Sequence, residues 1–372
     1  MENKKPWYYI DGIDQLDTPA LVIFPERVKK NIKTAIEMAG DVNRLRPHVK
    51  THKSPAVTEL MKAAGIQKFK CATIAEAEML GMCNAVDVLL AYQPGGPKLQ
   101  RFAELVKRYP HTQFSCLVDN KESALEQSTQ FEKNHLQIPV FIDLNLGMNR
   151  TGIDPGAEAI ELYKYCASLG GITISGLHAY DGHIRNADIN ARTIECDTAF
   201  SGVAKMKAEI IRCGLEAPLI IAGGSHTFPI HCKRNEVECS PGTFVYWDKG
   251  NSDYCPEQDF DVAALLISRI VSLPGINKIC IDLGHKSVAA ENPLVNRVFF
   301  LNAPETIAVS QSEEHLVLET KDSAVYKVGD ILYGIPVHVC PTIALYESAF
   351  TVEQGRVTGE WDTPARARKI TV

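Results

Sequence analysis

The sequence predicts an α/β protein in which a (β/α)8 TIM-type barrel precedes a C-terminal, mainly β domain. From about residue 20 to 250, short β-branched runs alternate with segments whose apolar residues recur every three or four positions, the spacing of amphipathic helices. Eight strand-like runs can be counted, and eight strands each followed by a helix or connection make one barrel. After about residue 255, helical spacing gives way to strand-like runs separated by Gly, Pro and Asn turns.

The eight runs define the expected barrel. A doubly wound open sheet is the alternative, but it rarely needs so many units in strict alternation. The helical spacing is clear at Val57, Leu60, Met61 and Ala64, which would share one helix face. The expected strands are Leu45–Lys50, Lys68–Thr73, Val86–Tyr92, Phe114–Asp119, Pro139–Asn145, Thr173–Tyr180, Pro218–Gly224 and Val237–Val245.

The C-terminal part is expected to form a β domain of roughly a hundred residues. We place the barrel at residues 25–255 and the β domain at residues 256–372. The run Ala20–Phe24 precedes the first expected barrel helix, so residues 1–24 are a candidate addition to the β domain. The expected strands of this domain are Val262–Ile270, Lys278–Asp282, Val295–Leu301, His315–Leu318 and Val337–Cys340.

Composition limits the classes of function. A net charge of −6 without a dense basic stripe argues against a nucleic-acid partner. No apolar run reaches membrane length, and the first residues lack a signal-peptide core, so a cytoplasmic protein is expected. The 11 cysteines are scattered without a CxxC pair, which indicates neither a disulfide framework nor a zinc finger. Small-molecule chemistry is therefore the expectation.

Polar or glycine-rich groups follow several of the expected barrel strands. In a barrel these strand ends converge on one face, where the loops build the active site. Such convergence favours an enzyme. The groups are Lys50, Thr73 with Glu76, Asn149–Gly152, Tyr180–His183 and Gly223–Thr227.

Lys50 ends the first expected strand, where Pro47 excludes a helix interior. A lysine held in a cleft at a strand end loses its proton more easily and can form a Schiff base with a carbonyl compound. A basic surface strand is the alternative.

The turn Gly223-Gly224-Ser225-His226-Thr227 closes a buried strand and can offer successive backbone N–H groups and hydroxyls to a phosphate. A phosphate site after the seventh strand recurs in barrels. A plain tight turn is the alternative. The chain lacks the glycine patterns of dinucleotide and nucleoside-triphosphate sites.

His338 and Cys340 alternate along an expected strand, so both would lie on one face and could share a divalent ion such as zinc or manganese. A buried His and Cys pair without metal is the alternative.

Three further side chains are candidates. Arg150 suits a phenolate or carboxylate oxygen, and a surface arginine is its alternative. His183, with Asp181 two residues away, is a candidate acid or base, against a turn or capping role for both.

Taken together, these motifs resemble the fold-type III pyridoxal-phosphate enzymes, in the branch of D-threonine aldolase and eukaryotic-type D-serine dehydratase. The resemblance spans nearly the whole chain in the expected order. The residues that carry it are Asp17–Leu21, Arg46–Lys53, Asn149–Gly152, Gly223-Gly224 and Pro336–Thr342.

The resemblance implies an alanine-racemase-like barrel and β domain, a homodimer, and pyridoxal 5'-phosphate carried by Lys50. It implies that His338 and Cys340 hold a metal, zinc or manganese, which binds the substrate's β-hydroxyl. Arg150 would face the cofactor's phenolic oxygen, and His183 would act as the base with Asp181 beside it. The other expected cofactor neighbours are His52, Tyr180, Gly223, Gly224, Ser225, His226 and Thr227.

The activity that the resemblance implies is a metal-assisted lyase acting on D-3-hydroxy amino acids, most of all cleavage of D-threonine to glycine and acetaldehyde. Lys286, Ser287 and Glu291 look more like the aldolase, whereas Cys340 looks more like the dehydratase. At the position where bacterial aldolases place their base this chain has Asn186, so His183 is expected to substitute. A D-serine dehydratase, an amino-acid racemase and a non-catalytic pyridoxal-phosphate carrier are the alternatives.

Overall fold

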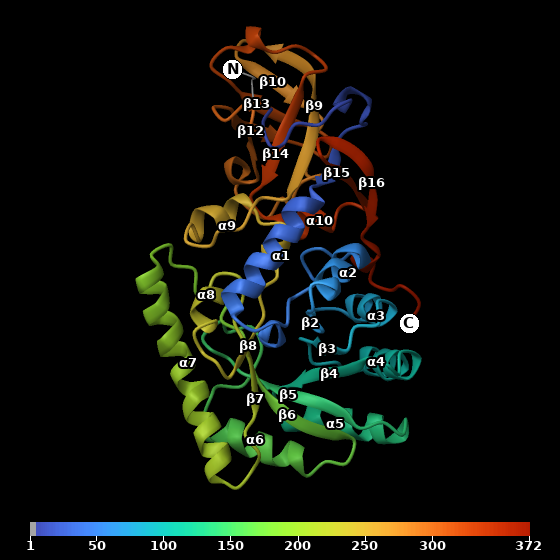
Figure 1. Ribbon diagram of the computed structural model, residues 1–372, viewed down its shortest axis with the longest axis vertical. Coiled ribbons are helices and arrows are strands. Elements are labelled where there is room, and N and C mark those ends of the chain that lie inside the picture. Colours follow the sequence, from blue (N-terminus) through green and yellow to red (C-terminus); the bar gives the residue numbers. More distant parts are fainter. Residues whose placement is uncertain (1–4) are drawn as a thin grey trace.

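The computed structural model describes residues 5–372, and the expectation for residues 1–4 lies outside that range. Two β-sheets organise the chain, with the barrel at one end and the second sheet at the other (Figure 1). The first sheet has seven parallel strands in the order β2-β3-β4-β5-β6-β7-β8. They are β2 (Lys68–Cys71), β3 (Asp87–Leu90), β4 (Gln113–Val118), β5 (Ile138–Asp143), β6 (Ile172–Ala179), β7 (Leu219–Ala222) and β8 (Val237–Cys239).

The segment Leu45–Val49 occupies the eighth position of the ring, between β8 and β2. The prediction of a regular strand here was wrong, because only single bridges form, Leu45 with Cys239 and His48 with Lys70. Pro47 has no N–H to donate to a ladder, although its carbonyl accepts from the Lys70 N–H at 2.8 Å. The barrel prediction is confirmed, with seven strands and one irregular segment.

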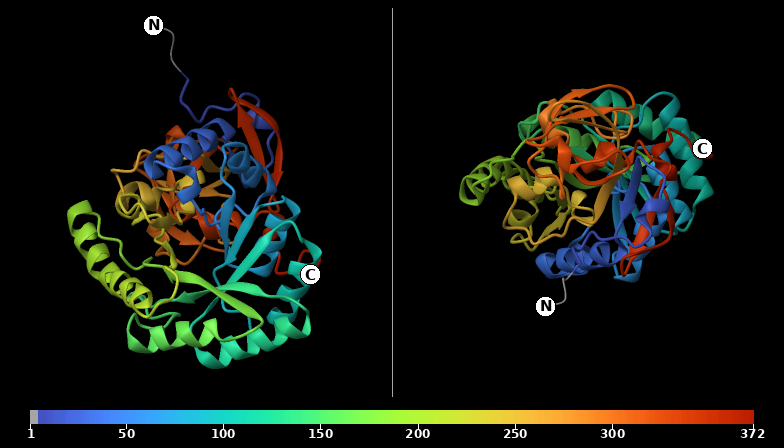
Figure 2. Two further views of the ribbon diagram at one scale, coloured as in Figure 1. Left: turned by 60° about the horizontal axis from the view of Figure 1, so that its bottom comes forward. Right: turned by 90° about the horizontal axis from the view of Figure 1, so that it is seen from above.

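Helices follow the strands and cover the outside of the barrel (Figure 2). Their first turns show why they begin where they do: Thr73, Asn120 and Asp188 each accept a hydrogen bond from a backbone N–H of the first turn. The helices are α1 (Pro25–Ala39), α2 (Pro55–Ala63), α3 (Ile74–Met82), α4 (Pro97–Arg108), α5 (Lys121–Lys133), α6 (Ala157–Ala167), α7 (Ile189–Arg212) and α8 (Phe228–His231).

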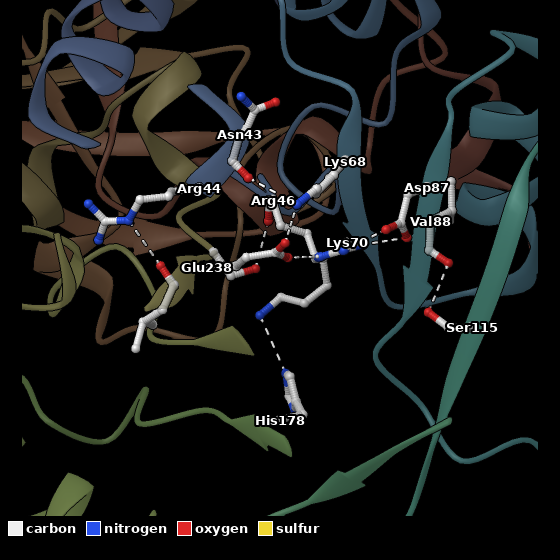
Figure 3. Close-up of polar contacts among 12 residues, drawn as sticks. Asn43, Arg44, Arg46, Lys68, Lys70, Asp87, Val88, Ser115, His178 and Glu238 are labelled. Carbon is white, nitrogen blue, oxygen red and sulfur yellow. Dashed lines mark hydrogen bonds and ion pairs between the residues drawn. The ribbon is translucent and has the colours of Figure 1, made fainter. Parts of the chain in front are cut away.

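The inside of the barrel contains an apolar layer and an ionic one. Leu89, Leu117, Phe141 and Ile221 pack against one another as a separate apolar cluster. Arg46, only 1% exposed, donates to both carboxylate oxygens of Asp87 at 2.7 Å and to Glu238 at 2.7 Å (Figure 3). Because the guanidinium is paired on two sides, its charge is compensated without water.

The second sheet is mainly antiparallel and has the order β12-β13-β10-β9-β1-β15-β16, with β14 pairing with β9 and β11. The early strand β1 (Ala20–Ile23) lies between β9 and β15. The other strands are β9 (Ala264–Gly275), β10 (Lys278–Ile281), β11 (Val298–Phe300), β12 (Ile307–Gln311), β13 (Leu316–Glu319), β14 (Ile331–Pro336), β15 (Ser348–Glu353) and β16 (Arg356–Asp362).

Two short helices lie near the junction of the sheets, α9 (Lys249–Tyr254) and α10 (Val339–Ile343). The prediction that Val337–Cys340 is a strand was wrong, because β14 ends at Pro336 and the chain then turns into α10. Our proposed division at residues 255 and 256 falls between α9 and β9. Among residues 5–372, no helix combines the length and apolar character needed to cross a membrane.

Candidate active site

A cavity of about 760 Å³ opens between the barrel and the second sheet. Residues far apart in the sequence meet in its wall. They include Lys50, Tyr180, Gly224, Ser225, His226, Thr227, His338 and Cys340 from the predicted set, together with His48, Gly242, Thr243 and Asp248. The ends of the barrel strands and the His338-Val339-Cys340 segment therefore converge on one cavity. Barrel topology predicted the meeting of the strand ends, but not that His338 and Cys340 would join them.

Lys50 lies in a turn that follows His48. The prediction that Lys50 ends a strand was therefore wrong. Its backbone N–H donates to Nδ1 of His48 at 3.2 Å, which tightens this turn. The side chain is partly buried, and Nζ lies 5.8 Å from the centre of the Tyr180 ring. The amine therefore faces an aromatic surface inside the cavity.

Two more cations approach the same ring of Tyr180. The guanidinium carbon of Arg150 lies 5.2 Å from the ring centre, and Nζ of Lys70 lies 5.5 Å from it. Within residues 5–372, none of Lys50, Lys70 and Arg150 forms a salt bridge. Two cationic side chains and a buried amine around one aromatic ring are suited to a planar, anionic ligand.

The predicted phosphate turn is built by two loops. Gly223 adopts a φ of +80°, and a side chain there would meet His231 at 2.6 Å. The backbone N–H groups of Gly242 and Thr243 point toward Ser225 Oγ, at 3.5 and 3.2 Å. Two N–H groups that converge on one oxygen form a site for an anion.

Thr227 does not offer a free hydroxyl to this site. Its Oγ1 donates to Asp181 at 2.7 Å and accepts from the Gly224 N–H at 3.2 Å. His226 does line the cavity, and its ring lies 6.2 Å from that of Tyr254. Burial, with the nearby Arg185, lowers the pKa of His226 to about 4, so its imidazole is neutral at physiological pH.

Asp181 has a structural role in this geometry. It is 1% exposed and accepts from Thr227 and from His231 Nε2, the latter at 2.8 Å. Burial alone would raise the pKa of Asp181, but these hydrogen bonds and His231 lower it. Of the two predicted readings, the turn and capping role fits better than that of acid or base.

Asp181, Cys196 and His231 also have the spacing of a metal site. Arg234 argues against that use, because its guanidinium can only donate and it lies 3.0 Å from His231 Nδ1. The His231 proton is therefore on Nε2, directed at Asp181, and no ring nitrogen is free for an ion. We read the trio as a hydrogen-bonded network beneath the phosphate turn.

His338 and Cys340 lie together at the start of α10. His338 Nδ1 lies 2.6 Å from Glu291 Oε1, and the imidazole hydrogen-bonds to the thiol of Cys340. Burial would raise the pKa of Cys340, but His338 lowers it; burial would lower the pKa of His338, but Cys340 and Glu291 raise it to about 9. An imidazole oriented by a carboxylate beside an easily ionised thiol has the character of a metal-binding pair.

Four predicted residues do not line the cavity, namely His52, Arg150, His183 and Gly223. His183 is exposed, and its Nε2 is 3.1 Å from where a side chain on Gly147 would begin. His52 is fully buried, with Nδ1 accepting from the Ser54 N–H at 3.1 Å. The imidazole that lines the cavity beside Lys50 is that of His48, four residues before His52.

Sequence reasoning missed Lys70, His178, Gly242 and Asp248. Asp248 is buried and accepts the Val339 N–H at 3.0 Å, which holds the first turn of α10 in place. Gly242 lay inside the predicted strand Val237–Val245, and that prediction was wrong after Cys239, where β8 ends and a Ser-Pro-Gly-Thr turn follows. Pro241 was the available signal, because it has no N–H to donate to a strand ladder. For Lys70 the one local signal is its alternation with Lys68 along β2. His178 and Asp248 carry no local signal, because only the tertiary fold brings them to the site.

Comparison with known proteins identifies the family. Residues 23–249 match the alanine racemase N-terminal domain family, and residues 263–352 match a serine dehydratase domain family. A D-threonine aldolase of Arthrobacter sp is 24% identical over 364 residues, covering 96% of this chain and 94% of that protein. A D-threo-3-hydroxyaspartate dehydratase of Delftia sp. is 26% identical over 263 residues, covering 68% of each.

Among solved structures, a D-threonine aldolase from Filomicrobium marinum superposes with a TM-score of 0.87 at 26% identity, covering 95% of this chain and 96% of that one. The match to the alanine racemase N-terminal domain includes more than half of the chain, and it contains Lys50, Arg150, Tyr180 and the Gly223-Gly224 turn. The chain therefore belongs to the family of proteins with an alanine racemase N-terminal domain, in the fold-type III branch that joins it to a serine dehydratase domain.

Proposed function

We propose that this chain is a pyridoxal-phosphate-dependent lyase acting on D-3-hydroxy amino acids, with cleavage of D-threonine to glycine and acetaldehyde favoured over dehydration. The observation that carries the proposal is the placement of Lys50 in a cavity wall with Tyr180 and the metal-type pair His338 and Cys340. The aldolase and dehydratase relatives support the lyase class, and the D-threonine aldolase structure superposes with a higher TM-score than a dehydratase structure, 0.87 against 0.82.

The residues fit the cofactor. Tyr180 offers a flat aromatic ring with Lys50, Lys70 and Arg150 around it, none of them in a salt bridge among the described residues, and the turns at Ser225 and Gly242 gather backbone N–H groups for a phosphate. When bound to Lys50, pyridoxal phosphate supplies a conjugated ring that withdraws electrons from the substrate's Cα. Arg150 would stabilise a negatively charged oxygen on that ring.

The residues also fit a divalent metal. His338 and Cys340 would hold it, with Glu291 orienting the imidazole, and the ion would act as a Lewis acid toward the substrate's β-hydroxyl. Zinc or manganese suits this donor pair.

For the proton acceptor we propose His226 in place of His183. Retro-aldol cleavage needs a base that removes the β-hydroxyl proton, and a base must reach that proton. His226 lines the cavity and is neutral at pH 7, whereas His183 packs against Gly147 outside the cavity wall. The His226→Asn and His183→Asn variants separate the two, because only the loss at the true base should lower kcat at saturating substrate.

The test of the function is a substrate panel. Purified protein loaded with pyridoxal phosphate is incubated with D-threonine and D-serine, with and without chelator, and glycine, acetaldehyde, 2-oxo acid and L-enantiomer are measured. Glycine with acetaldehyde supports the proposal; 2-oxo acid favours a D-serine dehydratase, and L-enantiomer a racemase. No turnover of either substrate would contradict the lyase and favour a carrier.

The cofactor assignment has its own control. Lys50→Ala should abolish the visible absorbance of the bound cofactor, whereas Lys53→Arg should keep it, because Lys53 pairs with Glu76 and arginine preserves that ion pair. A visible absorbance band that persists in Lys50→Ala would contradict the assignment of Lys50 as the attachment residue. The homodimer and the cytoplasmic location belong to the same proposal and are measured by light scattering and by cell fractionation.

A further inference from the structure

Lys70 is a buried amine for which the reaction above has no use. It lies on β2, is 1% exposed, and its side chain points into the barrel toward His178 (Figure 3). Its Nζ lies 5.5 Å from the centre of the Tyr180 ring, on which Lys50 also converges. Within the described part of the chain no carboxylate forms a salt bridge with it. Lysines are almost never this buried without a counter-ion.

The hydrogen bonds behind Lys70 show which way its protons point. Asp143 Oδ1 lies 2.7 Å from His178 Nδ1, and a carboxylate can only accept, so this nitrogen carries the imidazole proton. His178 Nε2 therefore has a free lone pair, and Lys70 Nζ lies 3.5 Å from it as the donor. Asp143, His178 and Lys70 form one buried chain that ends beside Tyr180, which lines the cavity.

The electrostatic surroundings of Lys70 are mainly positive. Burial, and after it the charge of Lys50, lowers the pKa of Lys70 to about 7, while the carboxylates of Asp181 and Asp143 act to raise it. Burial also lowers the pKa of His178, whereas the hydrogen bond that His178 donates to Asp143 acts to raise it. The charged or titratable groups around Lys70 are Arg46, His48 and Lys50 from the segment before α2, Asp143 from β5, Arg150 from the loop after β5, and His178, Tyr180 and Asp181 from β6 and its loop.

We propose that Lys70 is an anion-responsive amine of the site, largely neutral in the free chain at pH 8, which takes up a proton when the anionic cofactor enters the space beside Tyr180. This rests on the proposed cofactor, and it adds a residue that the family match does not single out. The protonated amine then supplies a third positive charge, with Lys50 and Arg150, and the His178–Asp143 pair holds it in place. The proton comes from solvent, so the binding reaction consumes one proton and no covalent bond changes.

The test measures protons and needs no turnover. The full-length chain, freed of cofactor, is titrated calorimetrically at pH 8 with pyridoxine 5'-phosphate, which lacks the aldehyde and cannot react with Lys50. Comparing buffers of different ionisation enthalpy gives the protons bound. An amine with a pKa near 7 is about one-tenth protonated at pH 8, so uptake by Lys70 should approach about one proton.

Lys70→Met should reduce the uptake by most of that proton and weaken binding by roughly tenfold at low salt. Lys68→Met is the matched control, since Lys68 lies two residues away on the same strand but pairs with Glu238. It should bind with wild-type uptake. Equal uptake in wild type and Lys70→Met would overturn the proposal.

Carbon NMR of the wild-type chain with labelled lysine provides a measurement that does not depend on a variant folding. One buried lysine should titrate near pH 7 in the free chain and move upward when pyridoxine 5'-phosphate binds. A full set of lysines that all titrate above pH 9 in the free chain would refute the role of Lys70. If pyridoxine 5'-phosphate binds saturably but proton uptake does not depend on Lys70, only the role of Lys70 is contradicted. If it does not bind saturably, the cofactor assignment is contradicted as well.

Discussion

The hydroxyl of Thr51 lies 3.1 Å from the thiol of Cys340, at a separation of 289 residues in the sequence. Thr51 follows Lys50, and Cys340 belongs to the candidate metal pair on α10. The contact therefore joins the turn that carries the proposed attachment lysine to the element that carries the proposed metal. Neither can move far without the other.

Cys340→Ala should lose the metal and most of the cleavage activity. The change removes one of the two proposed ligands, so bound metal measured by atomic emission should fall to background and kcat/KM at least about tenfold. Chelator should have the same effect on the wild type. Cys196→Ala is the control, because it alters the trio of Asp181, Cys196 and His231; metal lost from that variant and kept by Cys340→Ala would relocate the site.

Gly242→Ala should weaken cofactor binding. A Cβ at this position would meet the carbonyl oxygen of His48 at 2.9 Å, so the turn must shift and carry its N–H groups with it. We expect a loss of about tenfold in affinity, or about 1.4 kcal/mol, in a spectral titration with pyridoxal phosphate. Gly275→Ala, where a Cβ meets nothing within 4 Å, should bind normally. Normal binding by both variants would remove this turn from the phosphate site.

Asp181→Asn should flatten the acid dependence of stability. The pKa of Asp181 is lowered in the folded chain, so its ionised form contributes stability above about pH 4, and this is lost as pH falls through the folded-state pKa. Urea unfolding at pH 7 should show a loss of about 1–3 kcal/mol, because the buried partners Thr227 and His231 lose a charged acceptor. Toward pH 3 the difference between variant and wild type should shrink. A constant difference across this range would contradict the assigned direction.

Arg46→Met should destabilise the barrel strongly. It leaves the carboxylates of Asp87 and Glu238 without their buried guanidinium, a loss of about 3–5 kcal/mol. Lys68→Met removes only the more exposed partner of Glu238 and should cost about 1 kcal/mol or less. Chemical unfolding of both variants at pH 7 gives the comparison, and equal midpoints would show that the interior ion pairs contribute little.

The β-branched runs predicted the barrel well, because seven of the eight runs contain ladder strands whose side chains fill a core. The Leu45–Lys50 run failed as a strand since Pro47 interrupts its donors. The Val337–Cys340 run failed for a tertiary reason: Asp248 accepts the Val339 N–H and stabilises a helical turn there. A local pattern cannot reveal that partner.

The site was predicted least well where loops decide the direction of a side chain. His183 follows β6 as expected, but the loop turns it toward Gly147. Lys70 shows the opposite case. Strand alternation places Lys68 and Lys70 on one face, and in a barrel that face is the interior, so both could have been assigned to the lumen from period two alone.

The position of β1 in the second sheet has a consequence for biosynthesis. This strand leaves the ribosome before the whole barrel, yet its neighbours β9 and β15 are translated after it, and Thr18 hydrogen-bonds to Asp282 at a separation of 264 residues. The nascent strand stays unpaired and apolar until β9 has been translated, and it gains its second neighbour only with β15. A chaperone that shields Ala20–Phe24 should therefore raise the yield of native protein more than one acting on the later strands.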